Sequence, residues 1–485
     1  MSPKTMGDAM GVQVDGAPGP VQEARGRWWR TVSDAVWGRG SDPTRGPVGR
    51  AVLLLAIPMV LEMLMESVFA VVDIFFVSML GAEAVAAVGL TETLLSLVYT
   101  VAAGVGIGVT ALVARRIGEQ DEDAAARATV QAVALGAALA AVLGVAGIVY
   151  ARPLLRLMGA SADVVAVGAG YTAVSLGSSG VVLLLFLLNA AFRGAGDAAV
   201  AMRVLWLANG LNIALDPLLI FGLGPFPAMG VTGAAVATAV SRATGVAFQL
   251  GVLLRADGRL RIRGRHVRIQ PAIMWRLVRL SGTGTLQGLI GTVSWIGLAR
   301  IIAEFGSEAL AGYTIAIRVI LFALLPAWGF GNAAATMVGQ GLGAGDPDRA
   351  ERAVWLAGLM NLVLLGSAAT VSLIAAPGII ALFGTDGATS AYAIRCLRIV
   401  SLGFYPYAFG AVLTQAFNGA GDVWTATLLN LASIWVFEFP LAWMLAFPLG
   451  LGADGVFIAL ACSFSALSVL SALVFRRGRW RRVVV

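Results

Sequence analysis

Long apolar runs separated by short polar connections organise almost the whole chain, and this pattern predicts membrane-spanning helices. A helix needs roughly 20 consecutive apolar residues to cross the hydrocarbon core of a bilayer. The strands of a transmembrane β-barrel would instead alternate apolar and polar residues over segments of about ten. We therefore expect an all-α polytopic membrane protein with twelve spans, at about 50–78, 86–114, 124–150, 162–189, 198–222, 229–254, 272–303, 309–339, 352–376, 392–417, 424–448 and 453–475.

The first apolar run, residues 51–80, contains three acids, Glu62, Glu66 and Asp73. At about 100° per residue the three acids fall within a narrow arc of the helix, and Pro58 lies on the same side. A carboxylate at the bilayer centre costs roughly 2.5–3.5 kcal/mol on insertion scales. The three acids therefore predict a partner, a bound proton or a water-filled cavity.

Polar residues also share one face of the fifth run. Asn209, Asn212 and Asp216 recur at helical spacing, and Pro217 removes a backbone donor directly after the acid. Carboxylate, amide and freed carbonyl oxygens are hard ligands that suit a small cation. The sixth run adds the hydroxyl of Thr238 on a helix rich in small residues, which can pack closely.

The chain resembles itself at one constant separation in numbering, which predicts two similar halves. LGAEAVAA at 80–87 matches FGSEALAG at 305–312, so that Gly81 corresponds to Gly306, and AFRGAGD at 191–197 matches AFNGAGD at 416–422 in the same register. This separation covers six spans, an even number, so both halves have the same orientation in the membrane. The expected units are a disordered arm at 1–46, six-helix lobes at 47–254 and 272–475, a basic linker at 255–271 and a basic tail at 476–485.

The repeat does not reproduce the acids of the first half. It pairs Asp73 with Leu298, Glu62 with Gln287, Asn212 with Phe437 and Asp216 with Leu441, although the register drifts by two or three residues in this last region. We therefore expect one ion-binding site per chain, in the first lobe. Gln287, like Glu62, Glu66 and Asn209, is a candidate polar residue of a substrate cavity.

Glycine-containing loops recur in both halves and are expected to cap helices. Asp121 and Asp346 follow a glycine that ends one helix, and they precede the next helix, whose dipole favours negative charge at its start. In the two GAGD loops, small residues permit a tight turn, and Asp197 and Asp422 are expected to cap the helix that follows.

Composition supports a membrane protein and narrows its partners. The 485 residues are only 13% charged, against about 25% in ordinary soluble proteins. The formal net charge of +7 reflects arginine-rich connections after even-numbered spans, including 255–268, rather than nucleic-acid binding. The positive-inside rule then places both termini in the cytoplasm of a protein in the inner (plasma) membrane.

Cys396 and Cys462 give no disulfide framework, and His266 alone does not favour a histidine-based metal site.

The arm before the first span leaves two alternatives open. The segment RGRWWRTVSDAVWGR at 25–39 places Trp29, Val32, Val36 and Trp37 at helical spacing. It could form a short interfacial helix on the inner leaflet. It could equally be a disordered basic tail.

Taken together, these residues resemble the multidrug and toxic compound extrusion (MATE) family, and within it the DinF-like branch. The resemblance covers about 50–475. It rests on Pro58 and Asp73 of the first span, the two GAGD loops, NIALDP in the fifth span and VTGAAVAT in the sixth. The NorM-like branch carries a glutamate in the seventh span, whereas this chain reads SGTGTLQGLIG there.

The resemblance implies a V-shaped fold of two six-helix lobes and a cation site in the first lobe. The residues that match the family site are Asp73, Asn212, Asp216 and Thr238, which would bind H⁺ or, in a Na⁺-coupled protein, the metal ion. Pro58 matches a bend in the first span that changes with protonation of the acid near its outer end. Glu62 and Glu66 have no counterpart in this pattern.

The resulting hypothesis is an antiporter that exports small amphipathic, cationic compounds in exchange for H⁺ or Na⁺, functions as a monomer in the bilayer, and needs no cofactor besides the coupling ion. An alternative is a flippase for lipid-linked oligosaccharides, although such proteins place cationic residues in their cavity. An enzyme is not expected, because the chain has no HExxH and no GxSxG in a membrane helix. A channel or a scaffold that does not transport remains a further alternative.

Overall fold

The protein is a bundle of long helices in the computed structural model, which describes residues 20–39, 43–255, 258–384 and 387–484. Within these ranges there is no strand. Eleven helices are long and apolar enough to cross a membrane, and the bent pair α12–α13, with 57° between its parts, makes a twelfth span. The all-α prediction with twelve spans is thus confirmed.

The helices of the two halves correspond in order. The first half comprises α2 (Val48–Ser78), α3 (Ala82–Gly118), α4 (Glu122–Leu157), α5 (Ala162–Gly177), α6 (Ser179–Gly194), α7 (Ala198–Phe221) and α8 (Val231–Leu254). The second comprises α9 (Pro271–Ala303), α10 (Ser307–Gly343), α11 (Pro347–Ala381), α12 (Gly387–Leu402), α13 (Phe404–Ala420), α14 (Val423–Leu431), a π-helical segment (Ala432–Glu438), α15 (Phe439–Ala446) and α16 (Ala453–Arg476). The single helix α7 of the first half is matched by three consecutive segments of the second, namely α14, the π-helical segment and α15. The repeat pairs both the first and the last residue of α3 with those of α10, which confirms its register.

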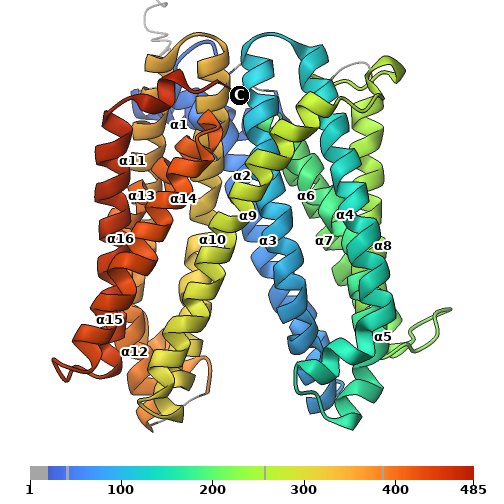
Figure 1. The fold of residues 1–485 in the computed structure, drawn as a ribbon, viewed down its shortest axis with the longest axis vertical. Coiled ribbons are helices and arrows are strands. Elements are labelled where there is room, and N and C mark those ends of the chain that lie inside the picture. The colour runs from blue at the N-terminus through green and yellow to red at the C-terminus, as the bar shows by residue number, and fades with distance from the viewer. Residues whose placement is uncertain (1–19, 40–42, 256–257, 385–386, 485) are drawn as a thin grey trace, which may run out of the picture.

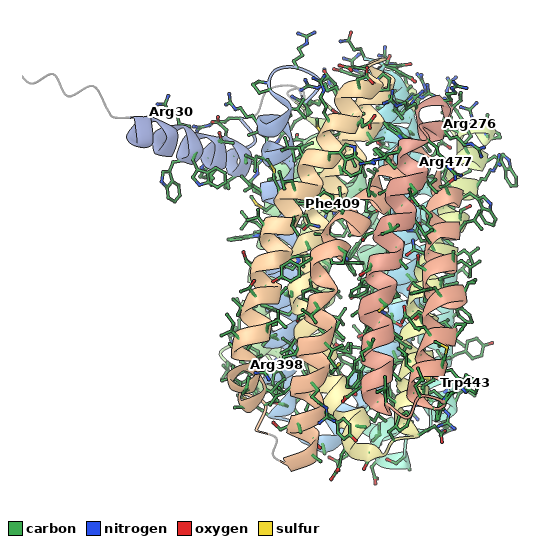
Figure 2. All side chains as sticks on the ribbon, turned by 90° about the vertical axis from the view of Figure 1, so that its left-hand side faces the viewer. Arg30, Arg276, Arg398, Phe409, Trp443 and Arg477 are labelled. Atoms are coloured by element: carbon green, nitrogen blue, oxygen red, sulfur yellow. The ribbon has the colours of Figure 1, made fainter. Side chains whose placement is uncertain are left out.

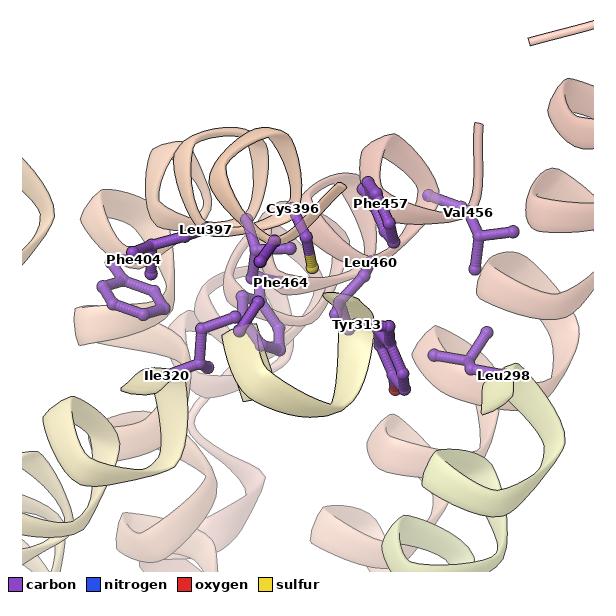
Figure 3. Packing of buried hydrophobic residues seen from close by; sticks show 14 of the residues in the cluster. Leu298, Tyr313, Ile320, Cys396, Leu397, Phe404, Val456, Phe457, Leu460 and Phe464 are labelled. Atoms are coloured by element: carbon purple, nitrogen blue, oxygen red, sulfur yellow. The ribbon is translucent and has the colours of Figure 1, made fainter. Parts of the chain in front are cut away.

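The two halves form a V, as Figure 1 shows, with the helices together at the end that carries α1 and the C-terminus. We call this the closed end and the opposite end the open end. The first helix of each half crosses between the lobes. Residues Val52 and Leu55 of α2 pack in an apolar core with α10, α11 and α13 of the second half. In the same way α9 packs along α3 of the first half, and then places Leu298 in the core of the second. Figure 3 shows that second core.

Glycines bring the two halves into backbone contact at the closed end. A Cβ on Gly118 of α3 would lie 2.1 Å from the carbonyl oxygen of Gln340 on α10. A Cβ on Gly343 would lie 2.2 Å from the carbonyl oxygen of Arg115. Two hydrogen bonds join the halves nearby: Thr336 donates to the carbonyl of Arg193 at 3.0 Å, and Gln340 to that of Gly194 at 2.8 Å.

Replacing Gly118 by alanine should therefore open the closed end. The added methyl overlaps backbone, which cannot rotate away, and such overpacking costs about 1–3 kcal/mol. Spin-label distances across the closed end should lengthen, and the thermal unfolding midpoint should fall. Gly89→Ala is the matched control on the same helix, because a Cβ there meets nothing within 4 Å. Equal behaviour of the two variants would contradict this account of the contact.

The repeated loops cap helices in one of the two expected ways. Asp121 accepts a hydrogen bond from the backbone N–H of Ala124 at 2.8 Å, and Asp346 accepts one from Arg349 at 2.9 Å. These caps confirm the prediction. Asp197 stands at the N-cap of α7 but makes no side-chain cap hydrogen bond, and Asp422 at α14 is the same. That prediction is wrong, because the half-buried Asp197 side chain lies close to Arg203 and Arg259 instead. Desolvation raises its pKa, while the two arginines oppose the shift.

The arm before the first span contains a helix, α1 (Pro20–Trp37), which includes most of the segment predicted as an interfacial helix. Figure 2 shows α1, labelled at Arg30, projecting sideways from the bundle near the closed end. Asp34 of α1 pairs with Arg50 at 2.8 Å, while Trp29 and Trp37 are exposed. Contact of these tryptophans with lipid stays a prediction.

The end of the arm is held by the second half, which differs from the expected disorder. Arg349 of α11 donates to the carbonyls of Pro43, Arg45 and Gly46, at 2.9 to 3.2 Å. The arm therefore bridges both halves at the closed end. The rest of the predicted disordered arm, residues 1–19 and 40–42, lies outside the described residues.

Candidate ion-binding and cargo sites

A cavity of about 600 Å³ lies between the two halves. Most of its lining comes from helices of the first half, above all α2, α3, α5, α6 and α8, and the second half contributes residues of α10 and α13. Its charged lining residues are Glu62, Glu66, Asp73, Glu92 and Arg193. Aromatic rings from Phe69, Tyr99, Tyr171, Phe186 and Trp328 and amides from Asn332, Gln415 and Asn418 complete a mixed apolar and polar surface. Such a surface suits an amphipathic ligand.

Three of the four residues predicted to bind the coupling ion form one hydrogen-bonded cluster. Asn212 and Asp216 lie one turn apart on α7, both buried, and Asn212 reaches Thr238 on α8 at 3.1 Å. The amide orientation that satisfies every polar atom lets Asn212 donate to Asp216 at 2.9 Å and accept from the backbone and hydroxyl of Thr238. The cluster depends on the close packing of α7 against α8.

Asp73 approaches this cluster from α2 without joining its hydrogen bonds. It is 8% exposed and lines the cavity together with Thr238. Its carboxylate and that of Asp216 are close enough to repel each other. Two like charges in a poorly solvated site favour the binding of a proton or a cation between them. Among the described residues, no Arg or Lys forms an ion pair with Asp73 or Asp216.

Together with Asp73, the cluster offers the ligands of a small hard cation rather than those of a transition metal. Two carboxylates, one amide and one hydroxyl offer oxygen ligands, and Pro217 inside α7 removes one backbone donor. In the described part of the chain, no group of three or more His, Cys, Asp or Glu residues could hold a metal ion. Either a proton or Na⁺ is therefore compatible with this site.

Glu62 has a partner that the sequence did not reveal. It is 1% exposed, and its carboxylate accepts hydrogen bonds from Arg193 at 2.7 Å and from Asn189 at 3.2 Å, both on α6. The prediction from sequence placed Arg193 in a basic cytoplasmic connection. The structure corrects this, because the last turn of α6 directs the side chain back into the protein toward the acid.

Glu66, one turn further along α2, has its own partner. Arg242 of α8 donates to Glu66 at 2.7 Å, and Asn209 of α7 donates to it at 3.1 Å. Arg242 is 1% exposed, and its guanidinium stands 5.0 Å from the ring centre of Phe69. The acids of α2 thus divide into two that are neutralised by arginine and one, Asp73, that is not.

Arg242 carried a signal that could have been found in the sequence. It lies within the sixth apolar run, where a charged residue is rare and requires a partner. Glu92 of α3 also escaped sequence reasoning, although it lines the cavity. The signal there was weak, because Glu92 lies near one end of its apolar run and could have faced water.

The remaining predicted residues are placed differently. Asn209 lies behind the cavity and reaches it only through Glu66. Gln287 does not line the cavity, because its part of α9 packs on α3, where Gly288 meets Thr100. Pro58 is buried within a continuous α2, and Gly329 of α10 packs on the backbone directly after it, at Met59 and Val60. A bend at Pro58 stays a prediction.

Comparison with known proteins supports one family throughout. The MatE family model matches residues 58–218 and 287–444. The chain is 26% identical over 442 residues to a probable multidrug resistance protein YoeA of Bacillus subtilis, covering 90% of this chain and 95% of that protein. It is 30% identical over 455 residues to a probable multidrug resistance protein NorM of Caulobacter vibrioides, covering 90% and 94%.

Comparison of the fold with solved structures points to the same family. A solved structure described as the outward-facing conformation of a multidrug resistance MATE family transporter superposes with a TM-score of 0.84. It is 26% identical in sequence and covers 91% of this chain and 98% of its own.

Proposed function

The chain belongs to the MatE family of membrane transporters, and on that premise we propose that it exports small amphipathic, cationic compounds in exchange for H⁺ or Na⁺. The two relatives described above are named as probable multidrug resistance proteins. The observation that carries the proposal is the pair Asp73 and Asp216, which stand near a cavity between the lobes without an arginine partner. The other two acids of α2 are already neutralised.

We propose that the closed end, and with it both termini, faces the cytoplasm. The arginine-rich connections, α1 and the C-terminus lie at this end, which the positive-inside rule assigns to the cytoplasm of an inner-membrane protein. The cavity then faces the outside. The chain would act as a monomer, since a single copy contains both halves of the cavity.

The steps of transport follow from this arrangement. From outside, Asp73 and Asp216 take up a proton or Na⁺, which removes the repulsion between them. The cavity loses negative charge and holds a cationic compound less tightly, so the compound leaves. The lobes then rock so that the backbone contacts at Gly118 and Gly343 separate, the ion is released into the cytoplasm, and new cargo enters. The ion gradient alone would drive this cycle.

Purified protein in liposomes tests this function. A fluorescent organic cation is placed on the cytoplasmic side of the protein, and H⁺ or Na⁺ is raised on the opposite side. The cation should then move across the membrane, and the flux should saturate with its concentration. Collapse of both gradients with nigericin and monensin should stop net uphill movement. Uphill export that persists without either gradient would contradict ion coupling, and flux that does not saturate would indicate a channel.

The flippase alternative is less well supported. A lipid-linked pyrophosphate needs several cationic residues in the cavity. Arg193 is the one arginine among the lining residues of the described chain, and Glu62 already neutralises it.

Membership of the DinF-like branch remains a proposal that rests on Pro58 and Asp73.

A further inference from the structure

One buried acid is not used by the mechanism above. Glu438, in the second half, is 2% exposed, and its Oε1 atom is buried without a hydrogen-bond partner. A carboxylate in such a place is costly unless it is paired or carries a proton. Within the described residues, no arginine pairs with it, in contrast to Glu62 and Glu66. The side chain therefore needs an explanation.

The register between the halves shows which residue of the first lobe Glu438 replaces. The N-caps of α8 and α16, Gly230 and Gly452, have nearly the same backbone angles, φ 56° and ψ −141° against φ 59° and ψ −141°. The N–H of Gly230 donates to the carbonyl of Ile220, and that of Gly452 donates to the carbonyl of Ala446. Ile220 and Ala446 are therefore equivalent, although the constant separation of the repeat would pair Ile220 with Leu445.

The start of this helix keeps the constant separation. Val423, which begins α14, is the residue that the repeat pairs with Ala198, which begins α7. One additional residue thus lies between the two ends, and the π-helical segment Ala432–Glu438 accommodates it. An inserted residue widens a helical turn into a π turn, and such turns are frequent at functional sites. Beyond the insertion, Glu438 is equivalent to Asn212, rather than Phe437 as the unshifted register predicts.

The surroundings of Glu438 differ from those of Asn212 in one consistent way. Leu298 replaces Asp73, and the corrected registers place Ala442 at the position of Asp216 and Leu460 at that of Thr238. All three replacements are buried and apolar. The register of α16 has independent support, because Ser463 donates to the carbonyl of Leu460 as Ser241 donates to that of Thr238.

The best candidate for a polar partner of Glu438 is the phenol of Tyr313 on α10. Figure 3 shows Tyr313 between Leu298 and Leu460 in the second core. Its hydroxyl is buried without a hydrogen-bond partner, and the residue is close enough to Glu438 to interact electrostatically. Ser463 is within reach of the carboxyl, but its own proton is given to a backbone carbonyl.

The other charged groups on the neighbouring elements either pair elsewhere or are exposed, as Glu308 and Arg318 of α10 are. Arg300 and Glu304 of α9 pair with each other at 2.7 Å, and Asp454 of α16 pairs with Arg395 at 3.0 Å. Helices α14 and α15 carry no titratable residue. The remaining groups are thiols, that of Cys396 beyond Tyr313 and that of Cys462 beside Ser463 in sequence.

We propose that Glu438 and Tyr313 form a second proton-binding site, in the second lobe, at the position related by the internal repeat to the ion site of the first. The chemistry selects a proton over Na⁺. A metal ion needs several oxygen ligands, and here apolar side chains stand where the first lobe supplies the carboxylates and the hydroxyl. One carboxyl can take up one proton from water when the lobe opens and return it when the lobe opens to the other side.

Infrared difference spectroscopy of the full chain in liposomes tests this site without relying on transport. A protonated carboxyl absorbs in its own spectral region, so a pH jump should reveal one band that Glu438→Gln removes. Glu308→Gln, an exposed acid on α10, should leave that band intact. Tyr313→Phe should move the pH at which the band is lost. Addition of Na⁺ at constant pH should not displace it.

The outcomes separate this inference from the transport proposal, on which its role in the cycle rests. The ratio of H⁺ flux to cargo flux is compared between the wild type and Glu438→Gln. A variant that carries one proton fewer per exported cation would support a coupled second site. A band that survives in Glu438→Gln, or one that Na⁺ displaces, would overturn the proton site even if export is ion-driven. If wild-type export proves independent of both gradients, the transport proposal fails, while the infrared result for Glu438 still stands.

Discussion

Asp216→Asn is expected to abolish most ion-driven export while leaving the folded protein intact. The carboxylate of Asp216 accepts a hydrogen bond from Asn212 at 2.9 Å and repels Asp73, and both effects concern a site that must hold a positive charge. Asparagine has no negative charge to attract a cation and no carboxylate to take up a proton, and an interaction with a charged group contributes about 1.5–3 kcal/mol. Ion affinity should therefore fall by roughly tenfold to a hundredfold. The readout is the initial rate of export from liposomes under an imposed pH or Na⁺ gradient.

Two further variants make the result specific. Asp73→Asn should reduce the rate to a similar extent, because each carboxylate supplies part of the same charge. Asp163→Asn, an exposed acid in the first turn of α5, should leave the rate unchanged. Wild-type export by both Asp73→Asn and Asp216→Asn would exclude this pair as the coupling site.

Glu66→Gln is expected to destabilise the protein more than any other single change at the cavity. It leaves Arg242, which is 1% exposed, without the carboxylate that forms an ion pair with it in the described part of the chain. Breaking a buried ion pair in this way costs about 3–5 kcal/mol, because the remaining charge has lost its compensation. Phe69 would still face the guanidinium at 5.0 Å, but its cation–π attraction contributes only about 2 kcal/mol when desolvated. The thermal unfolding midpoint in detergent should drop by several degrees.

The double variant Glu66→Gln with Arg242→Met distinguishes an ion-pair effect from a packing effect. Removing both charges together is often neutral or stabilising, so the midpoint should return toward the wild-type value. If single and double variants lose the same stability, the pair makes no net contribution and the packing of α2 on α8 explains the loss. Export assays on the double variant would then show whether this pair also positions cargo.

Sequence patterns were sufficient for the overall architecture. Apolar run length predicted the spans because every backbone group in a bilayer must be bonded within its own helix. The internal repeat predicted equal orientation of both halves. Helical periodicity placed Glu62, Glu66 and Asp73 on one side of α2, and all three line the cavity. These properties depend on local periodicity and on the membrane, so the folded structure adds little to them.

The partners of those acids required the tertiary structure. Glu62 pairs with Arg193, 131 residues away, and Glu66 with Arg242, 176 residues away. Helical spacing shows which face a residue occupies, but it does not show which helix that face meets. The packing of α6 and α8 against α2 decides that, and it turned two of three equivalent acids into ion pairs. Asp73 was separated from the others in this way.

The equivalence of Glu438 and Asn212 is the clearest case of what the fold alone decided. The sequence determined that two halves are duplicated and that the first half holds an acid–amide set. A constant separation then paired Asn212 with an apolar residue and suggested that the second half lacks a counterpart. One additional residue, accommodated as a π turn, shifts the register within a helix without interrupting its apolar pattern. Backbone hydrogen bonds reveal that shift, because they fix which residues are equivalent, whereas an apolar pattern is almost unchanged by a displacement of one.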